Sequence, residues 1–192
     1  MTQRRAPAAA SVEGDERIRL FCALRLPPDA IEPLVAWQRE ALGHLQGVRV
    51  LPGAHLHVTL AFLGHRPVAE VDAIVGALRK AAAAAEAPLL SVLRYRETRS
   101  VGMLALDDEG GRAQALAHDL HGRLEALGVY EQERREWLAH VTVLRFRQRP
   151  RLRPPLPDLE PFAPSDAAVY LSRLRPGGAQ YEVLEPVALG GR

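Results

Sequence analysis

The tetrapeptide His-Val-Thr-aliphatic occurs twice in this chain, at 57–60 in the first half and at 140–143 in the second. An imidazole ionises near neutral pH, so it can give or take a proton there. Two imidazoles at one site can act as a pair, one taking a proton from water and the other protonating the oxygen that leaves phosphorus. Neighbouring threonine hydroxyls can bind the remaining phosphate oxygens, where negative charge develops. The repeated motif therefore predicts phosphodiester chemistry that needs no metal.

Each motif lies in a short stretch with the alternation of a β-strand. Side chains alternate between the two faces of a strand, so His57 and Thr59 point to one face and the aliphatic residues to the other. The same holds for His140 and Thr142. If a pseudo-twofold axis relates the two halves, both polar pairs face one cleft. One His-x-Thr pair on a strand is usually structural, but two copies, one in each half, favour catalysis.

The elements that must position these motifs alternate between strands and helices. Alternating apolar residues predict strands at 17–27, 55–64, 89–97, 100–107, 140–147, 167–174 and 180–189. Helical spacing and high alanine content predict helices at 28–45, 68–86 and 111–128, and the proline-rich segment 150–161 predicts a loop. A long helix precedes the motif strand in each half. This order favours an α+β fold with mostly antiparallel pairing.

The composition is that of an ordinary globular chain, with 192 residues, 47% hydrophobic and 25% charged. We expect a flexible N-terminal tail at 1–17, without the apolar segment of a signal peptide, and a single domain at 18–192. No run reaches the roughly 18 apolar residues of a membrane span, so we expect no membrane association. The one cysteine, Cys22, excludes an internal disulfide and fits a reducing compartment. We expect a cytoplasmic monomer.

The residues around the two motifs resemble the 2H phosphoesterase superfamily, in particular the bacterial RNA 2′,3′-cyclic phosphodiesterases, also called the 2′-5′ RNA ligase family. The resemblance spans about residues 18–190 and rests on RLFCALRLP, HLHVTLAFLG, HVTVLR and VYLSRLRPGGAQYEVL. It implies a bilobal fold, in which two pseudo-symmetric lobes of mostly antiparallel sheet, with outer helices, surround a central cleft.

The resemblance also implies an activity and the residues that perform it. The expected enzyme opens the terminal 2′,3′-cyclic phosphodiester of RNA to a 2′-phosphomonoester, and 2′-5′ RNA ligation is a further expected activity. His57 is the expected proton donor and His140 the expected proton acceptor, with Thr59 and Thr142 beside them in the catalytic set. Arg145, five residues after the second histidine, is expected to bind the phosphate. The expected partner is RNA with a 2′,3′-cyclic phosphate end, tRNA fragments included, and no metal or other cofactor is expected.

Two other functions stay open at this point. The chain could be a phosphodiesterase for a small cyclic phosphate, such as a cyclic nucleotide or cyclic ADP-ribose phosphate. It could also be a non-catalytic module that binds RNA ends. A zinc site at His55 and His57, with His44 and His65 nearby, is a weaker alternative because no acidic ligand accompanies them.

Other arginine, phenylalanine and histidine residues could also contribute to a site or serve only the fold. Arginines recur at every second position from 145 to 153, and beyond Arg145 they form either a phosphate-binding edge or a solvated strand end. Phe21, Phe62 and Phe146 are expected to pack in the core rather than to stack on a base. The histidines at 118 and 121 are expected on the surface of the third helix.

Overall fold

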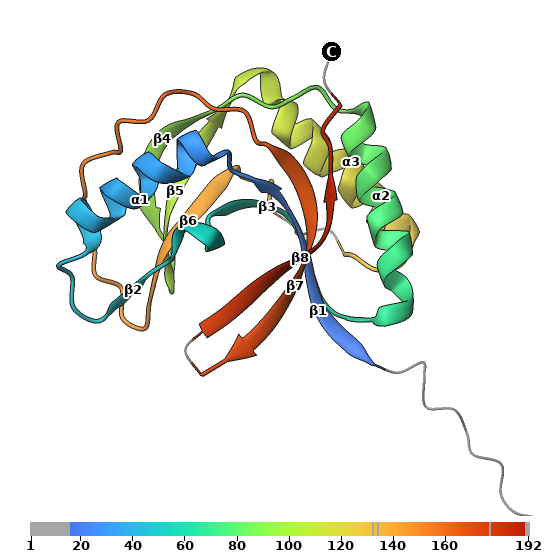
Figure 1. Ribbon diagram of the computed structural model, residues 1–192, viewed down its shortest axis with the longest axis horizontal. Helices are drawn as coiled ribbons and strands as arrows, with labels where there is room; N and C mark the ends of the chain where they lie inside the picture. The colour runs from blue at the N-terminus through green and yellow to red at the C-terminus, as the bar shows by residue number, and fades with distance from the viewer. Residues whose placement is uncertain (1–15, 132, 134, 177, 191–192) are drawn as a thin grey trace, which may run out of the picture.

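A curled antiparallel sheet forms the centre of the molecule, as the computed structural model in Figure 1 shows. The structure describes residues 16–190 except 132, 134 and 177, so most of the predicted tail at 1–17 lies outside the described residues. The strands are β1 (Arg17–Arg25), β2 (Val48–Val50), β3 (His57–Pro67), β4 (Leu90–Glu97), β5 (Val101–Asp108), β6 (His140–Phe146), β7 (Asp166–Arg175) and β8 (Gly178–Val187). The α-helices are α1 (Pro28–Leu42), α2 (Val71–Ala84) and α3 (Arg112–Ala126), with short 3-10 turns η1 (Gly53–His55), η2 (Val68–Glu70) and η3 (Glu109–Gly111).

The sheet brings the two motif strands together at its middle. Its order is β4-β5-β6-β3-β1-β7-β8, with β2 also paired to β6, and every recorded strand pairing is antiparallel. Residue Val58 of β3 lies directly opposite Val141 of β6. One lobe thus holds β1, β3, β7 and β8, and the other holds β2, β4, β5 and β6. The predicted α+β fold with two lobes of antiparallel sheet is confirmed, and the lobes share one continuous sheet.

The helices pack against one face of this curled sheet. Figure 1 shows α2 and α3 side by side on one side of the molecule and α1 on the other. Local chemistry fixes where α3 begins: Gly110 and Gly111 have φ of 70° and 67°, a conformation that glycine adopts at little cost. The Asp108 carboxylate then accepts hydrogen bonds from the backbone N–H groups of Ala113 and Gln114, at 3.0 and 2.8 Å. These bonds satisfy donors of the first turn that have no partner inside the helix.

The two faces of the sheet bury different sets of residues. Even-numbered positions of β1, such as Leu20 and Cys22, belong to the main core, which the helices also line. The odd-numbered Phe21 and Ala23 form a smaller cluster with Ala168 and Tyr170 of β7. Since side chains alternate along a strand, the smaller cluster lies on the opposite face from the main core. Cys22 is fully buried, as expected of a small hydrophobic residue, and burial raises the pKa of its thiol to about 12.

Several local predictions are wrong. β3 does not end at Gly64 but runs on to Pro67, because Gly64 takes a φ of 68° at an irregularity within the strand. His55 lies in η1 and not on the motif strand. The sequence also did not predict β2, because a strand of three residues is too short to show an alternating pattern. His121 is not on the surface: it is 4% exposed and its Nε2 lies 2.8 Å from the Leu60 carbonyl oxygen.

None of the helices in the described part of the chain is long and apolar enough to cross a membrane.

Candidate active site

The two motif strands repeat each other position by position. From each histidine onward, β3 and β6 show the same order of burial: half-buried, buried, half-buried, two buried, one exposed, one buried. Each strand also bulges at the third residue after its histidine, where the neighbouring strand skips Leu60 in β3 and Val143 in β6. A bulge inserts one extra residue and so reverses the alternation beyond it. It therefore brings Phe62 and Arg145 to the face of the histidines.

The strand pairing sets each histidine against the threonine of the other motif. Because β3 and β6 run antiparallel through the pair Val58–Val141, the chain neighbours of these two valines also come into register. His57 is thereby placed toward Thr142, and His140 toward Thr59. All four polar side chains lie on the face opposite the two fully buried valines, and all four are half-buried. The structure brings these predicted residues together.

Both imidazoles are oriented by the same hydrogen bond. Nδ1 of His57 lies 2.8 Å from the carbonyl oxygen of His55, and Nδ1 of His140 lies 2.8 Å from the carbonyl oxygen of Leu138. A carbonyl oxygen can only accept, so Nδ1 of each ring carries the hydrogen. Nε2 is then the atom that each ring offers to a substrate.

The two histidines interact electrostatically. Burial is the main cause that lowers the pKa of His57 to about 4, and the hydrogen bond to the His55 carbonyl opposes it. Positive charge on His140, on the His55 ring and on Arg145 also lowers the pKa of His57. Without a bound anion, His57 is therefore neutral at pH 7.

The pKa of His140 is also lowered, and again burial is the largest cause. The hydrogen bond to the Leu138 carbonyl opposes this shift, whereas the positive charges of Arg135 and Arg96 add to it. A neutral His140 with its hydrogen on Nδ1 has a lone pair on Nε2 that can accept a proton.

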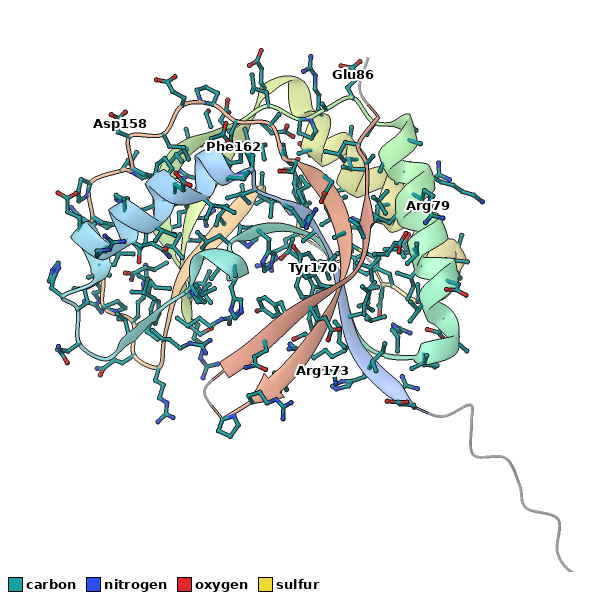
Figure 2. The ribbon with its side chains drawn as sticks, in the orientation of Figure 1. Arg79, Glu86, Asp158, Phe162, Tyr170 and Arg173 are labelled. Carbon is teal, nitrogen blue, oxygen red and sulfur yellow. The ribbon has the colours of Figure 1, made fainter. Side chains whose placement is uncertain are left out.

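Three aromatic rings surround His57. The ring centroids of Phe21, Tyr181 and Tyr170 lie 4.9, 5.4 and 5.8 Å from the imidazole centroid, and Phe21 stacks on Tyr170 at 4.8 Å. Tyr170 is labelled in Figure 2. The sequence placed Phe21 in the core, and it is indeed buried, but in the smaller cluster beside His57. The sequence did not predict that Tyr170 and Tyr181 lie at the site. For Tyr170 a signal was present, because alternation along β7 places its side chain on the face opposite Val169.

An ion pair lies on the same face as His57. Arg25 of β1 lies directly opposite His57 of β3 and directly opposite Asp166 of β7. Its guanidinium donates two hydrogen bonds to the Asp166 carboxylate. Arg25 lines a cavity of about 340 Å³ together with Tyr170 and Tyr181. Sequence reasoning missed Arg25 because no motif contains it.

Trp137 links the segment before β6 to β3. Its indole Nε1–H donates a hydrogen bond to the carbonyl oxygen of Thr59 at 3.0 Å. The bond joins a residue three positions before His140 to the strand that carries His57, so it helps to fix the two motifs relative to each other.

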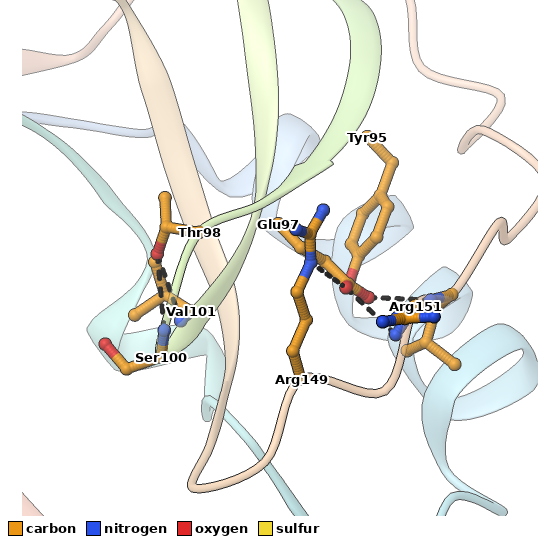
Figure 3. A network of polar contacts seen from close by, with 8 residues as sticks. Tyr95, Glu97, Thr98, Ser100, Val101, Arg149 and Arg151 are labelled. Atoms are coloured by element: carbon orange, nitrogen blue, oxygen red, sulfur yellow. Dashed lines mark hydrogen bonds and ion pairs between the residues drawn. The ribbon is translucent and has the colours of Figure 1, made fainter.

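Arg145 lies where the sequence predicted it, but the arginines that follow it do not continue its strand. Arg145 is exposed on the histidine face, and its charge is among those that lower the pKa of His57. β6 ends at Phe146. Arg149 turns to the buried carboxylate of Glu97, 3.1 Å away, and Arg151 has a left-handed φ of 59° (Figure 3). A continuous phosphate-binding edge along all these arginines is therefore wrong.

The zinc alternative gains no support from the geometry. The ring of His55 packs against Tyr181, with centroids 4.7 Å apart. Among the residues that the structure describes, no three histidine, cysteine, aspartate or glutamate side chains gather in a way that could hold a metal ion.

Comparison with known proteins finds a family, a relative and solved structures that are similar to this chain. The family described as "LigT like Phosphoesterase" matches residues 24–99. An RNA 2′,3′-cyclic phosphodiesterase of Thermus thermophilus is 32% identical over 186 residues, which cover 91% of each chain. The crystal structure of TT0787 from Thermus thermophilus superposes with a TM-score of 0.75 at 28% identity, over 91% of this chain and 99% of that one. The apo structure of E. coli LigT has the same fold, with a TM-score of 0.74 at 23% identity over 91% and 99% of the two chains.

The alignment with the Thermus enzyme covers 91% of each of the two chains. The structural match extends the likeness to both lobes and to the sheet that joins them. This chain therefore belongs to the LigT-like phosphoesterases of the 2H superfamily, enzymes that hydrolyse phosphodiester bonds.

Proposed function

We propose that this enzyme hydrolyses the 2′,3′-cyclic phosphate at the end of RNA to a 2′-phosphomonoester. The observation that carries the proposal is the pairing of the two His-x-Thr motifs on adjacent central strands, with Val58 opposite Val141 and both imidazoles held by the same hydrogen bond. The choice of RNA as the substrate follows the Thermus relative, which is an RNA 2′,3′-cyclic phosphodiesterase.

In the proposed reaction, Nε2 of His140 takes a proton from water as the water oxygen attacks phosphorus. The bond from phosphorus to the ribose O3′ breaks, and His57 gives its Nε2 proton to that oxygen. The product carries a phosphate on O2′ and a hydroxyl on C3′. Thr59, Thr142 and Arg145 hold the phosphate oxygens on which charge builds up.

His57 must be protonated to act as the donor, although its pKa in the free protein is about 4. A bound phosphate supplies the missing stabilisation, because negative charge beside an imidazole favours the imidazolium form. The hydrogen on Nδ1 stays bonded to the His55 carbonyl in both forms, so the ring keeps its orientation.

The same steps support 2′-5′ ligation as a second activity. If the 5′-hydroxyl of another RNA replaces water, His140 takes the proton of that hydroxyl and O3′ leaves as before. The phosphate then joins O2′ of one RNA to O5′ of the other.

The direct test is incubation of the purified protein with a short RNA that ends in a 2′,3′-cyclic phosphate, followed by identification of the product isomer. We expect the 2′-phosphate. Release of the 3′-phosphate would contradict the proposed direction of opening. Turnover of small cyclic phosphates alone would favour the small-substrate alternative, and tight binding without turnover would favour an RNA-end-binding role.

A further inference from the structure

A basic pocket opens next to the proposed active site. It has a volume of about 370 Å³ and lies between the end of β2 and the β7–β8 hairpin, with Arg49, His55, Arg175 and Gln180 among its lining residues. None of the described residues that line it is acidic. The two guanidinium groups give the pocket a positive potential, which attracts anions.

The pocket is separated from His57 by one aromatic ring. The ring of Tyr181 lies 5.4 Å from the ring of His57 on one side and 4.7 Å from the ring of His55 on the other, centroid to centroid. The Tyr181 ring therefore lies between His57 and His55, and His55 lines the pocket.

Two arginines on neighbouring strands lie between the proposed active site and the pocket. Arg145 of β6 lies directly opposite Arg49 of β2, and directly opposed residues of an antiparallel pair share one face. The charge of Arg145 lowers the pKa of His57, and the charge of Arg49 contributes, after burial, to the lowered pKa of His55. The two arginines thus connect the two sites electrostatically.

The pocket wall is built around the Arg49 guanidinium. A Cβ atom on Gly178, the first residue of β8, would overlap this group, and Gly178 has a φ of 119°, which favours glycine. The absence of a side chain at 178 allows the β2 segment and the hairpin to approach each other. The glycine thereby leaves room for the guanidinium at the wall of the pocket.

We propose that this pocket binds the backbone phosphate on the 5′ side of the terminal nucleotide, and this inference rests on the proposed function. A 2′,3′-cyclic phosphate is at the 3′ end of RNA, so the rest of the strand leaves the active site on its 5′ side. The planar fork of a guanidinium binds phosphate oxygens in pairs. A mononucleoside 2′,3′-cyclic phosphate has no such phosphate, so the pocket selects RNA strands over small cyclic phosphates.

The test compares two substrates and two pocket variants. The substrates are a trinucleotide that ends in a 2′,3′-cyclic phosphate and the matching mononucleoside 2′,3′-cyclic phosphate. In Arg49→Gln and in Arg175→Gln, we expect the ratio of kcat/KM for the trinucleotide to kcat/KM for the mononucleotide to fall about tenfold. The salt dependence of log kcat/KM for the trinucleotide should also become shallower, by about 0.7 for each lost phosphate contact. Arg79 of α2 forms an exposed ion pair with Glu185 of β8, and Arg79→Gln, which removes the same charge, should leave the ratio unchanged.

A binding measurement keeps this test separate from the test of the proposed function. The probe is a fluorescent trinucleotide with a 2′-phosphate end, and its Kd should rise about tenfold in the two pocket variants whether or not the wild-type protein turns over cyclic phosphates. An unchanged Kd and an unchanged substrate ratio in both variants would overturn the pocket assignment. If the wild-type protein does not turn over cyclic phosphates but the Kd still rises in the two pocket variants, only the proposed reaction is overturned.

Discussion

The charge of His140 reaches His57, and after burial it is one of the effects that lower the pKa of His57 to about 4. The two rings belong to strands that are far apart in the sequence but lie side by side in the sheet. Two groups that influence each other in this way titrate as a pair, and they cannot both be protonated without a cost. That coupling explains why the two histidines should act, and fail, as a unit.

Removal of either histidine should abolish most of the activity. In His140→Ala the proposed base is lost, and in His57→Ala the proposed acid is lost. Each change should reduce kcat by about 10²–10⁴-fold. Because both groups act in one step, the double variant should be scarcely slower than either single one. Rates on the cyclic-phosphate RNA across the pH range check this: the wild-type profile should be bell-shaped, and each variant should lose one limb. Near-full activity with an intact bell in both single variants would rule out the two-histidine mechanism.

Phosphate should raise the pKa of His57. Burial and nearby positive charge disfavour its imidazolium in the free protein, so the ring should titrate near 4. A bound anion counteracts the positive charge and favours the protonated ring, so the pKa should move upward toward neutrality. NMR titration of the His57 ring with and without inorganic phosphate measures this shift. A downward shift or none would contradict the proposed phosphate position.

The overall fold was largely predictable from the sequence because its strands and helices carry strong periodic patterns. The alanine-rich stretch became α2, and the alternating stretches became the long strands. The neighbourhood of β3 and β6 was inferred only from the repeated motif, since no local pattern specifies which strands pair. The short β2 escaped prediction because three residues do not establish a period.

The candidate site was predictable only where residues repeat. The histidines and threonines stand out because the same spacing occurs twice. Arg145 reaches the same face only through the bulge at Val143, since an odd spacing from His140 otherwise points to the opposite face. Arg25 and Tyr181 have no sequence signature, because strand register alone brings them beside His57.

Arg145→Lys should reduce kcat/KM although it preserves the charge. A lysine ammonium cannot reproduce the paired hydrogen bonds of the guanidinium fork, so we expect a loss of about tenfold. Steady-state kinetics on the cyclic-phosphate RNA measure it, and Arg147→Lys, just beyond the end of β6, is the matched control. If both variants keep the wild-type kcat/KM, Arg145 is only a solvent-exposed charge.

Activity should survive prolonged dialysis against EDTA. The proposed reaction draws its acid, its base and its phosphate-binding groups from side chains of the chain itself. The rate on cyclic-phosphate RNA should therefore be the same before and after dialysis. A loss of rate that only added zinc restores would revive the zinc hypothesis at His55 and His57.

The last prediction concerns the network that holds the segment after β6 (Figure 3). The Glu97 side chain is 3% exposed. Its carboxylate accepts hydrogen bonds from the Tyr95 hydroxyl, the Arg149 guanidinium and the backbone N–H groups of Arg151 and Leu152, at 2.7 to 3.2 Å. Glu97→Gln keeps the shape but turns an N–H₂ group toward these donors, so at least one of them loses its acceptor.

A buried donor without a partner costs about 1–3 kcal/mol, so Glu97→Gln should lower the free energy of unfolding by that amount. Arg149→Gln removes only the ion pair between Arg149 and Glu97. The Arg149 side chain is 57% exposed, and a pair with such an exposed partner contributes roughly 0–1 kcal/mol. Urea unfolding of the two variants measures the difference. Equal losses in both would mean that the ion pair, and not the backbone N–H groups, gives Glu97 its role. Since Glu97 lies outside the histidine site, kcat measured well below the unfolding transition should remain close to wild type in both variants.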